Sequence, residues 1–152
     1  MRLVLQRVKE AYVSAEGERV GSIGPGLVVF LCVEKGDDEA ITERYASKVV
    51  DLRIFADDQG KMNRSVRELG GGILVISQFT LAADAEKGRR PSFVRAAAPD
   101  VADRLYRHFV NKVREQGIHV ATGVFQAYMQ VGLINDGPVT ILLGGKGLPE
   151  DT

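Results

Sequence analysis

The sequence has no tryptophan, a single cysteine and only two histidines in its 152 residues. One cysteine cannot form an internal disulfide, and it cannot supply a cysteine-based metal cluster. Cys32 lies inside the apolar run Leu27–Val33. This placement predicts a buried structural thiol, because free cysteine packs as a small hydrophobe. We therefore expect neither a bound metal nor a cofactor.

An excess of charge is also missing, since 20 Lys and Arg residues balance 20 Asp and Glu residues. A net charge of zero argues against a protein that coats nucleic acid by bulk electrostatics, so any RNA contact must be local. No apolar run reaches the ~18 residues of a membrane span, and the N-terminal residues alternate like a strand rather than a signal sequence. These absences predict a cytoplasmic protein without a membrane segment.

What the sequence does contain is a strand-rich pattern with many turns, including 17 glycines. The chain length and a composition of 45% hydrophobic and 26% charged residues predict one globular domain over residues 1–152. Alternating or apolar runs bounded by turn residues predict strands at 2–8, Tyr12–Ala15, Arg19–Ile23, Leu27–Val33, Leu52–Phe55, Ile73–Gln78, His119–Thr122, Tyr128–Asn135 and Val139–Leu143. Helical spacing predicts helices at Asp37–Val50 and Asp100–Gln116. The expected fold is α+β, a curved or barrel-like sheet with two main helices packed outside.

The usual catalytic motifs are weak. His108 and His119 have no cysteine or carboxylate at ligand spacing, so ordinary surface or boundary positions are expected for both. Ser77 lacks the G-x-S-x-G turn of a serine hydrolase. The triplet Gly70-Gly71-Gly72 precedes a strand and not a helix, which indicates a turn rather than a phosphate loop.

Three segments are more informative. In Ile73–Leu81 a buried strand runs directly into Ser77, Gln78 and Thr80, and polar groups at the end of a core strand need partners or a function. Residues Asn135-Asp136-Gly137-Pro138 read as a hairpin turn between two strands. The segment Lys87–Phe93 gathers three cations, and either a solvated loop or a phosphate contact fits them.

Together these segments resemble the D-aminoacyl-tRNA deacylases, which hydrolyse D-amino acids mischarged onto tRNA. The resemblance runs from Met1 to Gly145 and includes two signatures in order, Ser77-Gln78-Phe79-Thr80-Leu81 and Asn135-Asp136-Gly137-Pro138-Val139-Thr140. The loop Gly88–Phe93 also resembles the family pattern. The chain departs from it in the acidic extension Leu148–Thr152.

The resemblance implies a homodimer with active sites at the subunit interface and the 3′ end of aminoacyl-tRNA as substrate. Gly137-Pro138 of one subunit, joined by a cis bond, would then enter the pocket of the other, and Asn135 would belong to the substrate-binding set. Arg7 shares a strand face with Leu3 and Leu5. It either fixes the incoming loop by hydrogen bonds or covers apolar surface as an edge-strand arginine.

The substrate bond is an ester, so its hydrolysis passes through an oxyanion. Ser77, Gln78, Phe79 and Thr80 are the expected catalytic segment, with backbone N–H groups near Phe79 and Thr80 stabilising that charge. Thr80 as a nucleophile lacks a nearby base in the sequence. The resemblance implies instead that the ribose 2′-hydroxyl of the tRNA assists. Phe125 and Met129 either wall the adenine site or belong to the core.

Two alternatives stay open at this point. A non-catalytic nucleic-acid-binding dimer would use the Lys87–Arg90 loop, although zero net charge and the lack of interleaved aromatics disfavour it. An enzyme that acts on glycine mischarged onto tRNA is the second, because sequence does not separate substrate ranges within the fold.

Overall fold

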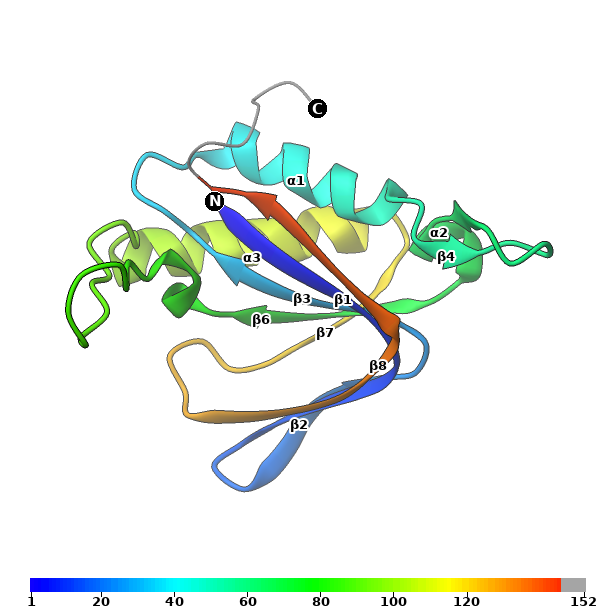
Figure 1. Ribbon diagram of the computed structural model, residues 1–152, viewed down its shortest axis with the longest axis horizontal. Coiled ribbons are helices and arrows are strands. Elements are labelled where there is room, and N and C mark those ends of the chain that lie inside the picture. The colour runs from blue at the N-terminus through cyan, green and yellow to red at the C-terminus, as the bar shows by residue number, and fades with distance from the viewer. Residues whose placement is uncertain (146–152) are drawn as a thin grey trace.

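The computed structural model describes residues 1–145, so the extension Leu148–Thr152 noted above lies outside the described residues. Figure 1 shows a strongly curved sheet with two long helices on one side of it. The strands are β1 (Arg2–Ala15), β2 (Glu18–Ile23), β3 (Gly26–Cys32), β4 (Phe55–Ala56), β5 (Met62–Arg64), β6 (Gly72–Ser77), β7 (His119–Thr122) and β8 (Met129–Gly144). The helices are α1 (Glu39–Asp51), α2 (Val66–Leu69), the 3₁₀ helix η1 (Phe79–Ala82) and α3 (Pro99–Glu115).

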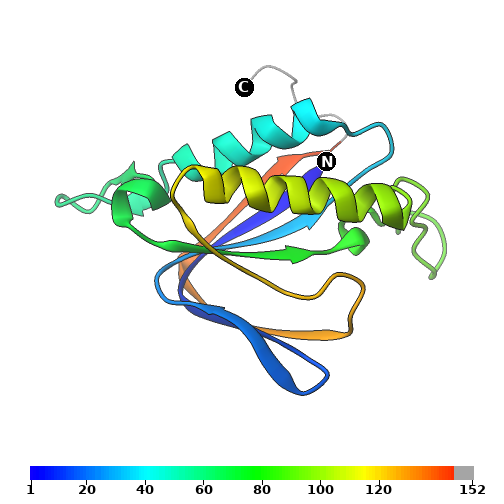
Figure 2. The same ribbon diagram turned by 180° about the vertical axis from the view of Figure 1, so that it is seen from behind.

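The main sheet is organised around the long strand β1. One edge of β1 pairs with β3 over residues 2–8 and with β2 over residues 11–15, and β8 pairs along the other edge. Beyond β3 the sheet continues in parallel through β6 to β7. Because β2 curls back toward β7, the sheet approaches a closed barrel, and the expected α+β class with two main outer helices is confirmed (Figure 2).

Two apolar clusters lie on the two faces of this sheet. The larger one fills the space between the sheet and the helices, with Leu3, Leu5, Leu105 and Phe109 among its most buried side chains. The smaller one fills the concave side where β1, β2, β6 and β8 curl around Val13. Among the described residues, no helix is both long and apolar enough to cross a membrane.

The helices begin and end where local chemistry dictates. Asp38 caps α1, its side chain accepting a hydrogen bond of 2.9 Å from the Ile41 amide. Pro99 opens α3, where its missing N–H costs nothing. Both long helices lie within two residues of their predicted bounds. The Gly70 turn is confirmed, with Gly70 in the left-handed conformation at the end of α2.

Three sequence expectations are wrong. The runs 2–8 and 12–15 form one strand, and only Phe55 of the predicted strand Leu52–Phe55 is extended within a sheet. The hairpin at 135–138 does not exist, because the runs on both sides of it pair with β1 as one strand, β8. Four residues, 136–139, bulge out between the pairs Asn135–Val8 and Thr140–Gln6. β1 is long enough to supply a partner to both runs, which removes the need for a turn.

Candidate active site

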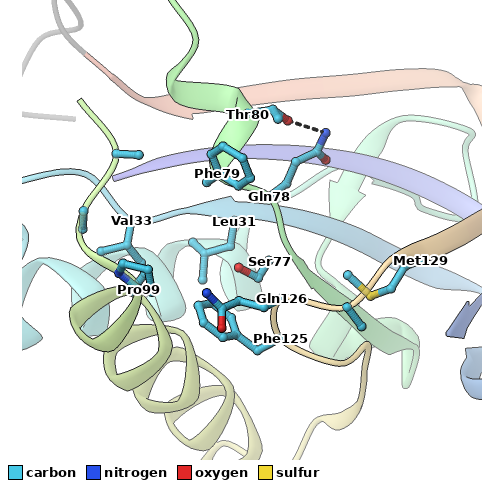
Figure 3. Close-up of a pocket in the computed structure, with 14 residues that line it drawn as sticks. Leu31, Val33, Ser77, Gln78, Phe79, Thr80, Pro99, Phe125, Gln126 and Met129 are labelled. Atoms are coloured by element: carbon cyan, nitrogen blue, oxygen red, sulfur yellow. Dashed lines mark hydrogen bonds between the residues drawn. The ribbon is translucent and has the colours of Figure 1, made fainter. Parts of the chain in front are cut away.

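The candidate site is a cavity of about 530 Å³ at the end of β6, a size suited to a small ligand or the end of a larger one. Its walls come from β3, the β6–η1 junction, the segment before α3 and the β7–β8 connection (Figure 3). The lining residues are Leu31, Val33, Ser77, Gln78, Phe79, Thr80, Ala96, Ala97, Pro99, Ala102, Phe125, Gln126, Ala127 and Met129. None of these side chains is ionisable, so this lining offers no carboxylate, imidazole, amine or thiol for acid-base chemistry.

The polar segment predicted as catalytic does line this cavity. β6 ends at Ser77, and the chain turns at once into η1 with Phe79 and Thr80 exposed. The amide of Gln78 still donates to the Leu31 carbonyl at 2.8 Å, which holds the turn to the sheet. The amides of Phe79 and Thr80 open the helix, and the first amides of a helix have no carbonyl within it to bond. They are therefore available as donors.

The side chains of this turn bond to one another. Gln78 donates from Nε2 to the Thr80 hydroxyl at 3.1 Å, as the dashed line in Figure 3 shows. The Phe79 ring meets Phe93 edge to face, with 5.2 Å between ring centroids. Thr80 Oγ1 is thus held by an amide, which cannot remove its proton. None of these neighbours is a base that could remove the hydroxyl proton and activate Thr80 as a nucleophile.

Cys32 lies directly behind η1 and is 1% exposed, which confirms the predicted buried thiol. Its Sγ lies 3.6 Å from the Phe79 carbonyl oxygen. Burial, assisted by the nearby Glu34 carboxylate, raises the pKa of the thiol to about 11. Cys32 is therefore a neutral packing residue and not a nucleophile.

Phe125 and Met129 both pack on the core, which confirms one of the two interpretations that the sequence left open, while their role as walls for adenine stays a prediction. Phe125 lines the cavity and also packs on the main core, with its ring 6.1 Å from that of Tyr106. Met129 lines the cavity and packs on the smaller cluster, while its sulfur accepts from the Val124 amide at 3.4 Å. Sequence reasoning did not identify Gln126, which lies between these two residues in the chain, lines the cavity and adopts a left-handed φ of 65°.

Arg7, Asn135, Gly137 and Pro138 form a second group, away from the cavity. Arg7 pairs with Leu27, four residues along β3 from Leu31, which pairs with Ser77, so the two groups stand roughly 13 Å apart along the strands. In Figure 1 the bend of β8 and η1 lie at opposite ends of the sheet. One chain therefore does not bring all the predicted site residues together.

Within this second group the 136–139 bulge is held at both ends. Arg7 donates from Nε to the Asp136 carbonyl at 2.8 Å and from a terminal nitrogen to the Ile54 carbonyl at 2.7 Å. The Asn135 side chain accepts from the Val139 amide at 2.7 Å and donates to the Val139 carbonyl at 3.2 Å. The edge-strand interpretation of Arg7 is wrong, since β1 is paired on both edges. The Gly137–Pro138 bond is cis, and both residues are exposed.

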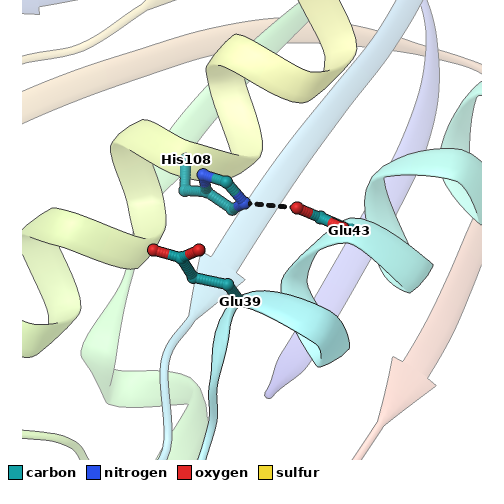
Figure 4. A group of neighbouring side chains, drawn as sticks. All are labelled: Glu39, Glu43 and His108. Carbon is teal, nitrogen blue, oxygen red and sulfur yellow. Dashed lines mark hydrogen bonds and ion pairs between the residues drawn. The ribbon is translucent and has the colours of Figure 1, made fainter.

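The two histidines are not part of the cavity lining. His108 on α3 lies 2.9 Å from a Glu43 oxygen of α1, with Glu39 nearby (Figure 4). The sequence could not show this pair, because 65 residues separate the two. Both glutamates are exposed, and a hydrogen bond between the two helices accounts for the arrangement of His108 and Glu43.

Comparison with known proteins places this geometry in a family. The profile described as D-Tyr-tRNA(Tyr) deacylase matches residues 4–144. A D-aminoacyl-tRNA deacylase of Syntrophotalea carbinolica is 59% identical over 143 residues, covering 94% of this chain and 96% of its own. The corresponding protein of Geobacter sulfurreducens is 56% identical over the full length of both chains. A solved structure titled c-Myc DNA Unwinding Element Binding Protein is 38% identical and superposes with a TM-score of 0.89, covering 95% of this chain and 99% of that one. The chain belongs to the D-Tyr-tRNA(Tyr) deacylase family.

Proposed function

We propose that this protein hydrolyses the ester of D-aminoacyl-tRNA, releasing free tRNA and the D-amino acid, and so removes D-amino acids before translation in the cytoplasm uses them. The observation that carries this proposal is the 56–59% identity, over nearly the whole chain, to proteins that bear the name D-aminoacyl-tRNA deacylase. The cavity at the end of β6 is the proposed site of the reaction. Its volume and apolar walls suit the terminal aminoacyl-adenosine of tRNA.

The lack of ionisable side chains in the lining limits the mechanism. Water attacks the ester carbonyl, a tetrahedral oxyanion forms, and its collapse expels the ribose oxygen with a proton. The protein supplies position and charge stabilisation: the backbone amides of Phe79 and Thr80 donate to the oxyanion, which is worth about 3–4 kcal/mol for one such donor. The 2′-hydroxyl beside the ester assists the attacking water, because the described lining offers no general base.

We propose that a second copy of the chain completes the site. The sheet face turned away from the helices carries Val4, Phe30 and Leu142, the last 68% exposed. A hollow on this face is also lined by Ser77, Gln78 and Met129, so the face is continuous with the cavity. Exposed apolar surface of this kind is typical of an interface.

A two-fold axis through this face would bring together its two unlike ends. In an isologous contact, a residue at one end of the patch meets the other end of the partner's patch. η1, which lines the cavity, lies at one end of the sheet, and the bend of β8, the strand that contains the exposed Gly137 and Pro138, lies at the other (Figure 1). The partner's Gly137–Pro138 main chain would then line the cavity. Light scattering should report about twice the 16.5 kDa of one chain, and an active monomer would refute the shared site.

Selection against L-amino acids follows from that arrangement. Main-chain carbonyls of the partner's Gly137 and Pro138 hold the substrate ammonium and occupy the side where an L side chain would project. Such a site reads only the atoms around Cα, so it accepts many D-amino acids. Glycine has no side chain to exclude, and glycyl-tRNA should also be cleaved.

The test uses purified protein with tRNA charged with D-tyrosine, L-tyrosine or glycine, and follows ester loss with time. We expect fast loss of the D-ester, measurable loss of glycine and an L-ester that decays at the rate seen without protein. Equal decay of all esters with and without protein would refute the enzyme. A D-tyrosyl-tRNA with a 2′-deoxy terminal ribose should lose most of the acceleration.

A nucleic-acid-binding dimer without catalysis remains the competing function, and the printed title of the 38% identical structure names a DNA element. The two functions differ in one readout. A binding protein would retain tRNA or DNA on a filter while leaving the D-ester intact, whereas the enzyme turns over many esters per chain.

A further inference from the structure

A loop with three cations lies beside the cavity and is not used by the reaction described above. It spans residues 84–92, and two backbone hydrogen bonds of 2.8 Å between Asp84 and Ser92 close it at the base. Every residue from Asp84 to Ser92 is exposed. Lys87, Arg89 and Arg90 lie in its tip, with Glu86 beside them. We call this segment the 84–92 loop.

The two ends of the 84–92 loop continue into two walls of the cavity. The chain enters it from η1, which supplies Phe79 and Thr80 to the lining, and leaves it toward Ala96, Ala97 and Pro99. Just past the loop, Phe93 packs against Phe79. In Figures 1 and 2 the loop projects past η1 at the same end of the sheet. A nucleic-acid strand whose end lies in the cavity and which leaves on this side therefore passes the loop.

The three cations of the loop have no carboxylate partner among the described residues and so remain free to meet an anionic ligand. Across the part of the chain that the structure describes, Arg67, Arg104 and Lys112 each pair with an acid within 4 Å. No such pair involves Lys87, Arg89 or Arg90 among residues 1–145. The Asp84 carboxylate accepts instead from the Glu86 amide at 3.1 Å. The loop therefore carries three cations, none of them in an ion pair with a described residue, and two acids, which gives it a net charge of +1 in a chain of zero net charge.

We propose that the 84–92 loop binds the backbone phosphates of the acceptor end of the substrate tRNA while its terminal aminoacyl-adenosine occupies the cavity. This inference rests on the proposed deacylase function. The ester reaches the cavity at the end of a single strand, so phosphates follow it out of the mouth. Each arginine guanidinium group can donate two parallel hydrogen bonds to phosphate oxygens, and the lysine ammonium adds a positive charge. Contacts to phosphates do not depend on the nucleotide sequence, which suits an enzyme that must accept many tRNAs.

The test compares the double variant Arg89→Gln/Arg90→Gln with a matched control, Arg53→Gln/Lys61→Gln. The control removes two exposed cations that precede β4 and β5 and are not among the residues that line the cavity. With D-Tyr-tRNA, the loop variant should raise KM about tenfold at low salt and leave kcat nearly unchanged. The slope of log(kcat/KM) against log[salt] should become shallower by about 1.4–1.8, at 0.7–0.9 per lost phosphate contact. The control should match the wild type.

A substrate without phosphates distinguishes phosphate binding by the 84–92 loop from a role of the loop in maintaining the fold. D-tyrosyl-adenosine carries the same ester but no backbone phosphate, so the loop variant and the wild type should hydrolyse it at equal rates. Equal losses on D-tyrosyl-adenosine and on D-Tyr-tRNA would show that the loop only supports the fold, and would overturn the proposal. An unchanged KM and salt slope on D-Tyr-tRNA would also overturn it.

A binding measurement with uncharged tRNA tests the phosphate contact independently of the proposed deacylase activity. Fluorescence anisotropy with labelled, uncharged tRNA should show weaker binding and a shallower salt slope for the loop variant, whether or not ester is hydrolysed. A wild type that cleaves no ester but shows this difference would refute the deacylase and leave the phosphate contact standing. Equal anisotropy curves for wild type and loop variant would refute the phosphate contact alone.

Discussion

Replacing Arg7 by methionine tests whether the 136–139 bulge is held in place from β1. Arg7→Met keeps the apolar stem but removes the two hydrogen bonds to the carbonyls of Asp136 and Ile54, which measure 2.8 and 2.7 Å. A hydrogen bond from a charged donor contributes about 1.5–3 kcal/mol, so at the lower value the two together contribute about 3 kcal/mol. For a chain of this length each kcal/mol shifts Tm by about 2–4 °C, which gives an expected loss of about 6–12 °C.

The assay is thermal unfolding followed by circular dichroism, combined with hydrolysis of D-Tyr-tRNA well below Tm. Lys9→Met, at an exposed position on the same strand, should unfold within about 1 °C of the wild type. Arg7→Lys should recover part of the loss, because one ammonium can reach only one of the two carbonyls well. Activity of Arg7→Met should fall at least about tenfold if the proposed dimer forms, since the bulge would no longer have a fixed position at the partner's cavity. A variant that unfolds with the wild type and keeps full activity would refute the role given to Arg7.

Three further results are expected. Thr80→Ala keeps the backbone donor, so kcat should fall less than about tenfold, and a stable acyl-Thr80 adduct in mass spectrometry would contradict this. Because the pKa of Cys32 is raised to about 11, its thiol is protonated at pH 8 and should react with a disulfide reagent only after unfolding in guanidinium; rapid labelling of the native protein would contradict its burial. Gly26→Ala should cost about 3 kcal/mol or more in chemical denaturation, because its Cβ would lie 1.9 Å from the Gly72 carbonyl oxygen, whereas Gly24→Ala meets nothing within 4 Å and should be neutral.

How far the sequence could predict the fold depended on the range of the interactions involved. The stripe that contains Leu105 and Phe109 predicted α3 closely, because helical periodicity is local and its buried face is continuous. The bulge at 136–139 was predicted as a hairpin because Gly137 and Pro138 are ordinary turn residues. Only pairing with β1, more than a hundred residues earlier, reveals the continuous strand.

The candidate site could likewise be predicted only in those parts that leave a local signal in the sequence. Polar residues after a buried strand indicated Ser77–Thr80, and these residues do line the cavity. The walls supplied by Ala96, Ala97 and Pro99 carry no chemical signal in the sequence, because small apolar residues serve many roles. Gln126 also lines the cavity, and its left-handed backbone could not be predicted from its residue type.

The most direct test of the central claim, a cavity on one subunit completed by the 136–139 bulge of the other, is a mixed dimer. Thr80→Pro removes the proposed backbone donor from the cavity, because proline has no N–H, and should reduce kcat about 10²–10³-fold. Co-expression with Arg7→Met under a second affinity tag allows the heterodimer to be isolated. In the proposed dimer, its one intact cavity, on the Arg7→Met subunit, would face the intact bulge of the Thr80→Pro subunit. The shared site predicts about half the wild-type D-Tyr-tRNA hydrolysis per dimer, and a heterodimer as inactive as the two parent variants would contradict it.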